Sequence, residues 1–265
     1  MGPPRRHALA LLAVLLVATA SVAQIEEEDI PAPAEPATPT AAQAGAQDPA
    51  LPPPPSPAAL VGEAERRYAE GDLEAAAQLY RQAADALPAG EEQYRLLVTL
   101  ATLEQQLGQA EPAVTTLTRL LTQRLDYAVQ AELYGADFVS LYFDARKRAL
   151  DERARLAEER TRGGAARREA GDFAAARGLL AEALVLRPNY PLALYELALV
   201  AQKSGNAEAA IAGFQKLLAL AAAAGDEVPP QLYARALQNV GILYYNRSFF
   251  EEAELHLTQA ARLEP

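Results

Sequence analysis

The chain has 265 residues, 51% of them hydrophobic, a formal charge of −11, and no cysteine or tryptophan. This composition is typical of a globular or repeat protein, and it excludes disulfide bonds and thiol chemistry. The net negative charge opposes binding to a polyanion, so we expect no nucleic-acid partner.

Residues 1–23 have the pattern of a secretory signal peptide. Arg5 and Arg6 precede an apolar run from Ala8 to Ala20, which small residues follow. As a helix this run would be about 20 Å long, shorter than the roughly 30 Å hydrocarbon core of a bilayer. We expect cleavage after Ala23, or after Ala20 as a second choice, and export to the periplasm or cell envelope. An uncleaved segment that anchors the chain in a membrane is the alternative.

Residues 24–57 form an acidic, Pro/Ala-rich linker. The stretch has no hydrophobic periodicity, and it contains the acidic run Glu26–Asp29 and the proline run Pro52–Pro55. It can bury too little apolar surface to offset the entropy of ordering, so we expect it to be disordered. The proline run could bind an aromatic groove, but we expect a spacer. The acidic run is not expected to hold a metal.

From residue 58 onward, five segments share one register. A turn residue is followed by alanine five positions later, a large apolar residue four positions beyond, and alanine or leucine three beyond that. These steps place the side chains on one helix face, so each segment predicts two helices joined by a tight turn. The turn residues are Gly71, Gly108, Gly171, Gly205 and Ser248, and the alanines are Ala76, Ala113, Ala176, Ala210 and Ala253. The large residues are Tyr80, Leu117, Leu180, Phe214 and Leu257.

This register resembles the tetratricopeptide repeat, a 34-residue helix–turn–helix unit. The resemblance implies an all-α, right-handed superhelical solenoid of antiparallel helix pairs, with repeats 1 and 2 in residues 58–125 and repeats 3–5 in residues 157–265. It also implies a protein or peptide partner. The glycine that the family places at the helix crossing is kept as Gly164 and Gly241, and alanine replaces it in the other repeats.

Residues 126–156 connect the second and third repeats. Helical spacing of apolar residues, without glycine or proline from Ala136 until Gly163, predicts one long helix that begins near Asp137 and runs into the third repeat. Nine basic residues lie between Arg146 and Arg168, interleaved with acidic ones. We expect a solvated face with ion pairs between helix neighbours, and a cationic patch for an anionic partner is the alternative.

The residue types offer little catalytic chemistry. After the signal peptide, His256 is the only histidine, so a multi-histidine metal site cannot form. A serine–histidine–acid triad would have to use His256 as well. The glycine pair Gly163-Gly164 lacks the pattern of a phosphate-binding loop. We therefore expect neither an enzyme nor a cofactor.

The resemblance implies a concave groove lined by the inward-facing positions of each first helix. The mixture of aromatic, aliphatic and amide side chains at these positions suits an extended peptide or a helix of a partner protein. Tyr195 and Tyr245 are the expected aromatic anchors. In the fourth and fifth repeats the groove residues are Leu192, Tyr195, Leu199, Gln202, Arg235, Gln238, Ile242, Tyr245 and Asn246.

The last repeat is expected to leave an apolar flank partly uncovered, formed by Leu257, Ala260 and Leu263, because internal repeats cover this flank with the next helix. A homodimer through the C-terminal repeat would cover it, and a sequence truncated at Pro265 is the competing explanation. Three functions therefore remain open. They are an exported scaffold that binds a partner in the groove, an envelope subunit that self-associates through its ends, and a membrane-anchored regulator.

Overall fold

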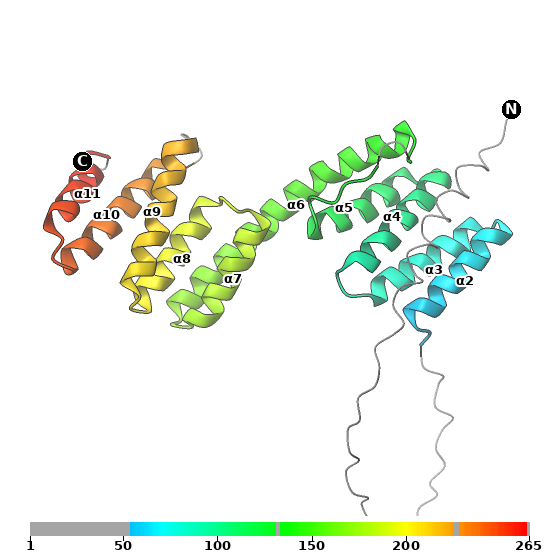
Figure 1. Ribbon diagram of the computed structural model, residues 1–265, viewed down its shortest axis with the longest axis horizontal. Helices are drawn as coiled ribbons and strands as arrows, with labels where there is room; N and C mark the ends of the chain where they lie inside the picture. Colours follow the sequence, from blue (N-terminus) through cyan, green and yellow to red (C-terminus); the bar gives the residue numbers. More distant parts are fainter. Residues whose placement is uncertain (1–53, 131–132, 225–227, 264–265) are drawn as a thin grey trace, which may run out of the picture. The chain divides into compact units, whose positions relative to one another are not determined.

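The structure is a computed structural model that describes residues 54–130, 133–224 and 228–263 (Figure 1). These residues form ten helices, and none of them is in a strand. No helix in these ranges is long and apolar enough to cross a membrane. The predicted signal peptide and nearly all of the predicted linker lie outside the described residues.

The helices belong to two compact units. The first contains the chain up to Leu117 together with Asp126–Phe143, and the second contains Thr118–Leu125 and the chain from Asp144 onward. Helices α2 (Pro57–Glu70), α3 (Leu73–Ala86), α4 (Glu91–Gln106), α5 (Ala110–Gln123) and α6 (Ala136–Glu169) come first along the chain. Helices α7 (Phe173–Leu186), α8 (Pro191–Lys203), α9 (Ala207–Ala224), α10 (Pro230–Asn246) and α11 (Phe250–Leu263) follow. The all-α fold predicted from the sequence is therefore confirmed.

The turn inside each helix pair depends on a residue with positive φ. Four glycines and one serine hold this conformation, and all five are turn residues of the predicted register: Gly71 (85°), Gly108 (74°), Gly171 (81°), Gly205 (80°) and Ser248 (63°). Glycine adopts left-handed backbone angles readily because it has no Cβ. The next residue then caps the second helix in three turns. Asp72, Asp172 and Asn206 each accept a hydrogen bond from the backbone N–H three residues later, at 3.2, 3.1 and 3.0 Å.

The small and large apolar residues of the register form the core of each pair. All five alanines, from Ala76 to Ala253, are at most 2% exposed. The large residue is buried in four pairs and half-buried in the last, where it is Leu257. Next to the large residue of each pair, the first helix carries glycine or alanine. A Cβ added to Gly164 would lie only 2.6 Å from Leu180 Cγ, and one added to Gly241 only 2.7 Å from Leu257 Cγ. In these two pairs the helices therefore pack so closely that the crossing position has no room for a side chain.

A buried carboxylate joins three helices of the first unit. Glu104 on α4 is 1% exposed, and its two oxygens accept hydrogen bonds from Arg81 of α3 at 2.7 Å and from Thr116 of α5 at 2.8 Å. A buried charge is tolerated where it is paired and hydrogen-bonded in this way. The network therefore fixes how α4 lies between its neighbours.

The long helix α6 carries all nine basic residues noted in the sequence, and many of them have partners. Arg155 pairs with Glu152 and Glu159 along α6, and Arg160 pairs with Glu182 of α7 at 3.0 Å. In the second unit, Arg153 donates hydrogen bonds to the backbone carbonyls of Thr122, Val185 and Leu186. These carbonyls lie in the last turns of α5 and α7, where backbone C=O groups have no hydrogen-bond donor within their own helix. The basic stretch thus serves packing and ion pairing along α6.

Two adjacent glycines of α6 allow a matched test of the close crossing. Gly164→Ala should destabilise the protein by about 1–2 kcal/mol, because the added methyl overlaps Leu180 and the helix propensity gained is smaller than that cost. Gly163→Ala should instead be neutral or stabilising by up to about 1 kcal/mol, since its new Cβ would lie 3.4 Å from the end of the Leu179 side chain. Thermal unfolding followed by circular dichroism measures both. Equal effects at the two positions would contradict the crossing.

Candidate functional site

The groove residues predicted from the sequence lie on α8 and α10, the first helices of two consecutive pairs in the second unit. These two helices contact each other directly. Asn239 Nδ2 of α10 donates a hydrogen bond to Tyr195 Oη of α8 at 3.1 Å, and also donates to the carbonyl of Arg235 at 2.9 Å. The bond between the helices sets Tyr195 level with Asn239. We call the surface formed by the predicted groove residues the α8–α10 face.

Most side chains of the α8–α10 face are accessible. Leu192 and Ile242 are each 40% exposed, and Tyr245 is 60% exposed. The remaining accessible members are polar or half-buried: Arg235, Gln238 and Asn246 are exposed, and Leu199 and Gln202 are half-buried. The face therefore offers apolar, amide and cationic contacts to a ligand.

Tyr195 has a different position from the other members. It is 9% exposed, and its ring packs against Phe214 of α9 with centroids 5.5 Å apart, inside a core cluster shared by α8, α9 and α10. Burial raises the pKa of its phenol above the ordinary value, although the hydrogen bond from Asn239 opposes this shift. The ring thus stabilises the packing of the helices that form the face, and Tyr245 is the more accessible aromatic side chain.

The two tyrosines should respond differently to truncation. Tyr195→Ala should cost about 3–5 kcal/mol of stability, because it empties a site in the core between α8, α9 and α10. Tyr245→Ala should change stability by no more than about 1 kcal/mol, because most of its ring is already in solvent. Chemical denaturation of both variants measures the difference. A small loss for Tyr195→Ala would show that its ring does not support the face.

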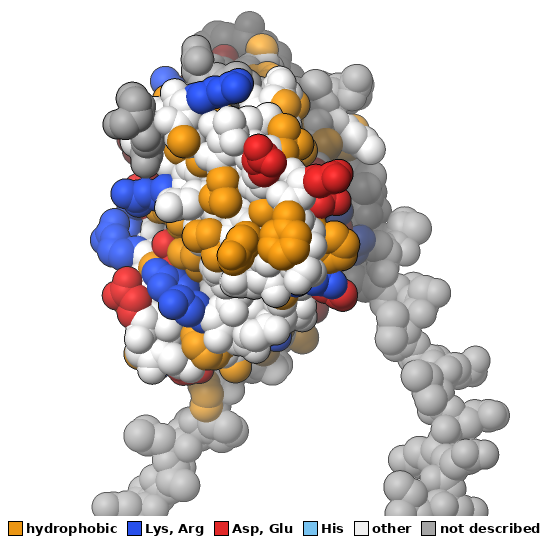
Figure 2. Space-filling model, turned by 90° about the vertical axis from the view of Figure 1, so that its left-hand side faces the viewer, with side chains coloured by type: hydrophobic (Ala, Val, Ile, Leu, Met, Phe, Trp, Pro, Cys, Tyr) orange, Lys and Arg blue, Asp and Glu red, His pale blue; other side chains and the backbone are white. Residues whose placement is uncertain are grey.

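Aromatic side chains that the sequence analysis did not single out continue the face at its C-terminal end. The ring of Phe250, 59% exposed, lies edge-on to Tyr245 with centroids 5.6 Å apart, and Phe249 is 45% exposed. Of the eleven exposed large hydrophobic side chains in the described chain, six lie between Ile242 and Leu263. Figure 2 looks onto this end of the molecule and shows hydrophobic side chains gathered at the centre, with charged ones around them. In the sequence, the aromatic pairs Tyr244-Tyr245 and Phe249-Phe250 on either side of the last turn indicate this cluster.

The C-terminal flank expected to be uncovered is only partly so. Leu257 and Ala260 are half-buried, and Leu263 is 46% exposed. Glu254 occupies the position that holds Ile211 in α9, which the next pair buries to 7% exposure. An acidic residue at this position weakens the apolar character of the flank. Dimerisation through the C-terminal repeat remains a prediction.

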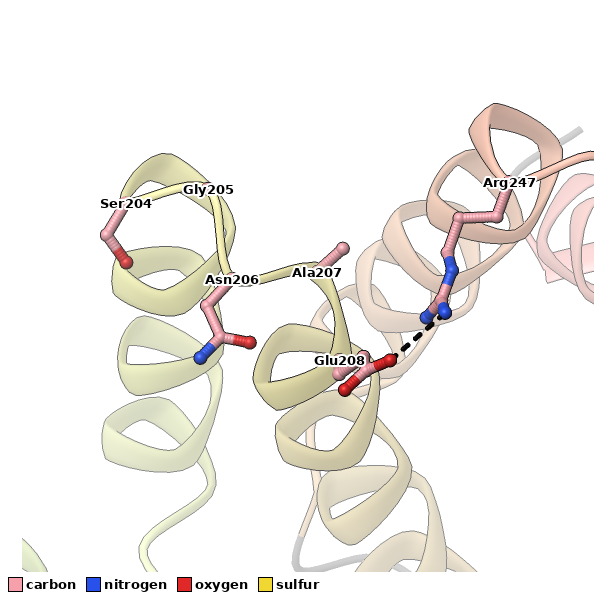
Figure 3. Close-up of a pocket in the computed structure, with 6 residues that line it drawn as sticks. All are labelled: Ser204, Gly205, Asn206, Ala207, Glu208 and Arg247. Atoms are coloured by element: carbon pink, nitrogen blue, oxygen red, sulfur yellow. Dashed lines mark hydrogen bonds and ion pairs between the residues drawn. The ribbon is translucent and has the colours of Figure 1, made fainter.

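A polar hollow of about 440 Å³ lies between the α8–α9 turn and Arg247 of the α10–α11 turn (Figure 3). It is lined by Ser204, Gly205, Asn206, Ala207, Glu208 and Arg247. Its two charged side chains pair with each other, with Arg247 Nη2 3.2 Å from Glu208 Oε1. The described residues also contain no group of three or more His, Cys, Asp or Glu side chains placed to hold a metal ion. The charged groups of the hollow thus pair with each other, and we take the α8–α10 face as the candidate site.

No protein-family model and no curated protein matches the chain. Among solved structures, a crystal structure of MamA is 21% identical, with a TM-score of 0.37 over 76% of this chain and 94% of that one. MamA 41-end from Desulfovibrio magneticus RS-1 is 18% identical, with a TM-score of 0.34 over 78% and 94%. TTC0263, a thermophilic TPR protein in Thermus thermophilus, is 21% identical, with a TM-score of 0.30 over 79% and 92%.

The repeat architecture is visible in the helix pairs themselves. Left-handed turn residues recur at Gly71, Gly108, Gly171, Gly205 and Ser248. Buried alanines follow each turn, and glycines at two crossings leave room for a large side chain of the second helix. These features together are those of tandem helix–turn–helix repeats. The chain has a tetratricopeptide-repeat fold.

Proposed function

We propose that the chain is a scaffold that binds a peptide or a helix of another protein on the α8–α10 face. The observation that carries the proposal is the accessible row of Ile242 and Tyr245 on α10, beside Leu192 and Leu199 of α8. The hydrogen bond between Asn239 and Tyr195 holds these helices in register, so a partner meets a surface that is already ordered.

The composition of the face suits a polypeptide ligand. Ile242 and Tyr245 are three residues apart on one helix, so their side chains lie on the same side. Rigid aromatic side chains of this kind contribute large contact area at low entropic cost. The exposed amide of Gln238 and the guanidinium of Arg235 can donate hydrogen bonds to backbone carbonyls or carboxylates of the ligand. Such a combination fits an extended segment or an amphipathic helix.

The partner should be identified by pull-down from an envelope extract with the processed chain as bait. Ile242→Ala and Tyr245→Ala should each weaken binding of the identified partner by about 5–30-fold, which corresponds to roughly 1–2 kcal/mol. Leu255→Ala is the matched control, because Leu255 is 56% exposed on α11 but is not a residue of the face. Isothermal titration calorimetry measures the affinities.

Two outcomes would contradict this function. Unchanged affinity in both face variants would place the contact elsewhere. If the pull-down recovers only further copies of this chain, and Leu263→Glu abolishes that recovery, the self-associating envelope subunit would be favoured instead. That alternative draws on the exposed hydrophobic side chains of α10 and α11.

We also propose that this scaffold acts outside the cytoplasm. The proposal rests on Arg5 and Arg6, the apolar run that follows them, and the small residues at 21–23. N-terminal sequencing of protein purified from cells should find Gln24, or Ser21 if the second site is used. Intact Met1 in the soluble cytoplasmic fraction would refute export, and intact Met1 in membranes would favour the anchored regulator.

A further inference from the structure

Two hydrogen-bond donors of the α8–α10 face have no acceptor among the residues that the structure describes. The hydroxyl of Tyr195 accepts a hydrogen bond from Asn239 Nδ2 at 3.1 Å, and donates its own proton to none of these residues. Arg235 is exposed, and within the described chain its guanidinium forms neither an ion pair nor a hydrogen bond. It lies one helical turn before Asn239, on the same side of α10. A single asparagine therefore stands between two donors that have no acceptor.

The one acidic side chain of these two helices is already paired. Glu196 is the only acidic residue of α8, and α10 contains none. The carboxylate of Glu196 lies 2.8 Å from Nε of Arg168 on α6, and the two side chains are only 12% and 15% exposed. A carboxylate held in this way is not free to bind Arg235. A ligand can therefore bind Arg235 without displacing an existing ion pair.

Tyr195 is held as a neutral donor. Burial raises the pKa of its phenol above the ordinary value, whereas the hydrogen bond from Asn239 and the charge of Arg235 oppose the rise. The phenol therefore keeps its proton at neutral pH. Asn239 Nδ2 also donates to the carbonyl of Arg235 at 2.9 Å, so this amide nitrogen acts only as a donor. The hydroxyl proton of Tyr195 is thus available to a ligand.

We propose that the Tyr195 hydroxyl and the Arg235 guanidinium bind the side-chain carboxylate of a glutamate or aspartate in the partner polypeptide. A carboxylate can accept several hydrogen bonds at once, and its bonds to a guanidinium are charge-assisted. The inference rests on the proposed function, because it concerns the same face, and it names the chemistry that this face selects. Tyr195 and Arg235 determine specificity, while Ile242 and Tyr245 supply apolar contact area.

Apolar side chains on both sides of the donor pair favour an internal acidic residue over a chain end. Helices α8 and α10 are each joined to α9 by a short connection and pack against it, so they run in the same direction. Leu192 lies one turn before Tyr195 on α8, and Ile242 lies one turn beyond Asn239 on α10. Each of the two aliphatic side chains is 40% exposed. A ligand that covers both must continue on each side of its carboxylate, as an acidic residue between aliphatic residues does.

The test uses the intact chain as purified from cells and two peptides with blocked ends, acetyl-Leu-Glu-Leu-amide and acetyl-Leu-Gln-Leu-amide. The peptides differ only in the side-chain carboxylate. NMR titration follows the backbone amide signals of α8 and α10 and the Nε–H signal of Arg235. The glutamate peptide should bind at least about 5-fold more tightly than the glutamine peptide, because the amide has no charge and only one oxygen acceptor.

Two variants each remove one donor and preserve the rest of the side chain. Tyr195→Phe and Arg235→Gln should each reduce the preference for the glutamate peptide to less than about 2-fold. Tyr233→Phe and Arg262→Gln are the matched controls, because they remove the same groups outside the face, and they should leave the preference unchanged. Circular dichroism shows whether each variant is folded. Arg235 is exposed, so its variant tests the pair even if Tyr195→Phe is destabilised.

Three results would overturn the inference. They are unchanged α8 and α10 signals at about 10 mM glutamate peptide, equal binding of the two peptides, and a preference that persists in Arg235→Gln. A third peptide, acetyl-Leu-Gln-Leu with a free C-terminus, distinguishes the source of the carboxylate. If it binds as tightly as the glutamate peptide, the donor pair takes a chain end and the internal acidic residue is wrong.

The proposed function is judged separately, with the partner from the pull-down. If that partner needs Ile242 and Tyr245 but binds equally well after its acidic residues are neutralised, the scaffold stands and the carboxylate site does not. If the glutamate preference is found but the partner is insensitive to Ile242→Ala and Tyr245→Ala, the carboxylate site stands and the proposed binding of the partner on this face does not.

Discussion

The close approach of two helices at a position that holds only glycine or alanine is the constraint on which each repeat depends. At Gly164 and Gly241 a methyl group would overlap the large residue of the second helix, and that second helix also contributes a buried alanine, Ala176 or Ala253. Helix axes that lie this close bury apolar surface with little side-chain material. This explains how a chain rich in alanine and poor in aromatic residues still forms a well-packed core.

The same constraint leaves one side of α8 and of α10 exposed. The second helices place their apolar stripe in the core, where Ala210, Phe214 and Leu217 of α9 are all 0% exposed. Helices α8 and α10 pack against α9 with one side and against each other with another. Their remaining side therefore carries residues that contribute little to packing, such as Gln238 and Tyr245. The α8–α10 face is thus a consequence of how the pairs stack.

The helix pairs were predictable from the sequence because their determinants are local. A turn residue, a cap and side chains at steps of three and four lie within about thirty residues, so their effects add along one segment. The burial of Tyr195 was not predictable, because it depends on Phe214 and Asn239 from two other helices. The same holds for Glu104, whose partners lie 23 and 12 residues away. Such contacts depend on how the pairs pack, which spacing along the chain does not define.

Ser248 holds the position that glycine holds in the other four turns, and its φ of 63° is a left-handed conformation that costs a residue with a Cβ about 1–2 kcal/mol. The helix that follows it, α11, has Leu257 half-buried where the other pairs bury this residue. A strained turn and the partial exposure of Leu257 both favour local opening of α11, so we expect this helix to detach before the rest of the unit unfolds. Amide protons of α11 would then exchange with solvent through local opening, and Phe250 would leave Tyr245 each time the helix detached. The backbone strain at Ser248 thereby influences how often the aromatic pair at the outer edge of the α8–α10 face is intact.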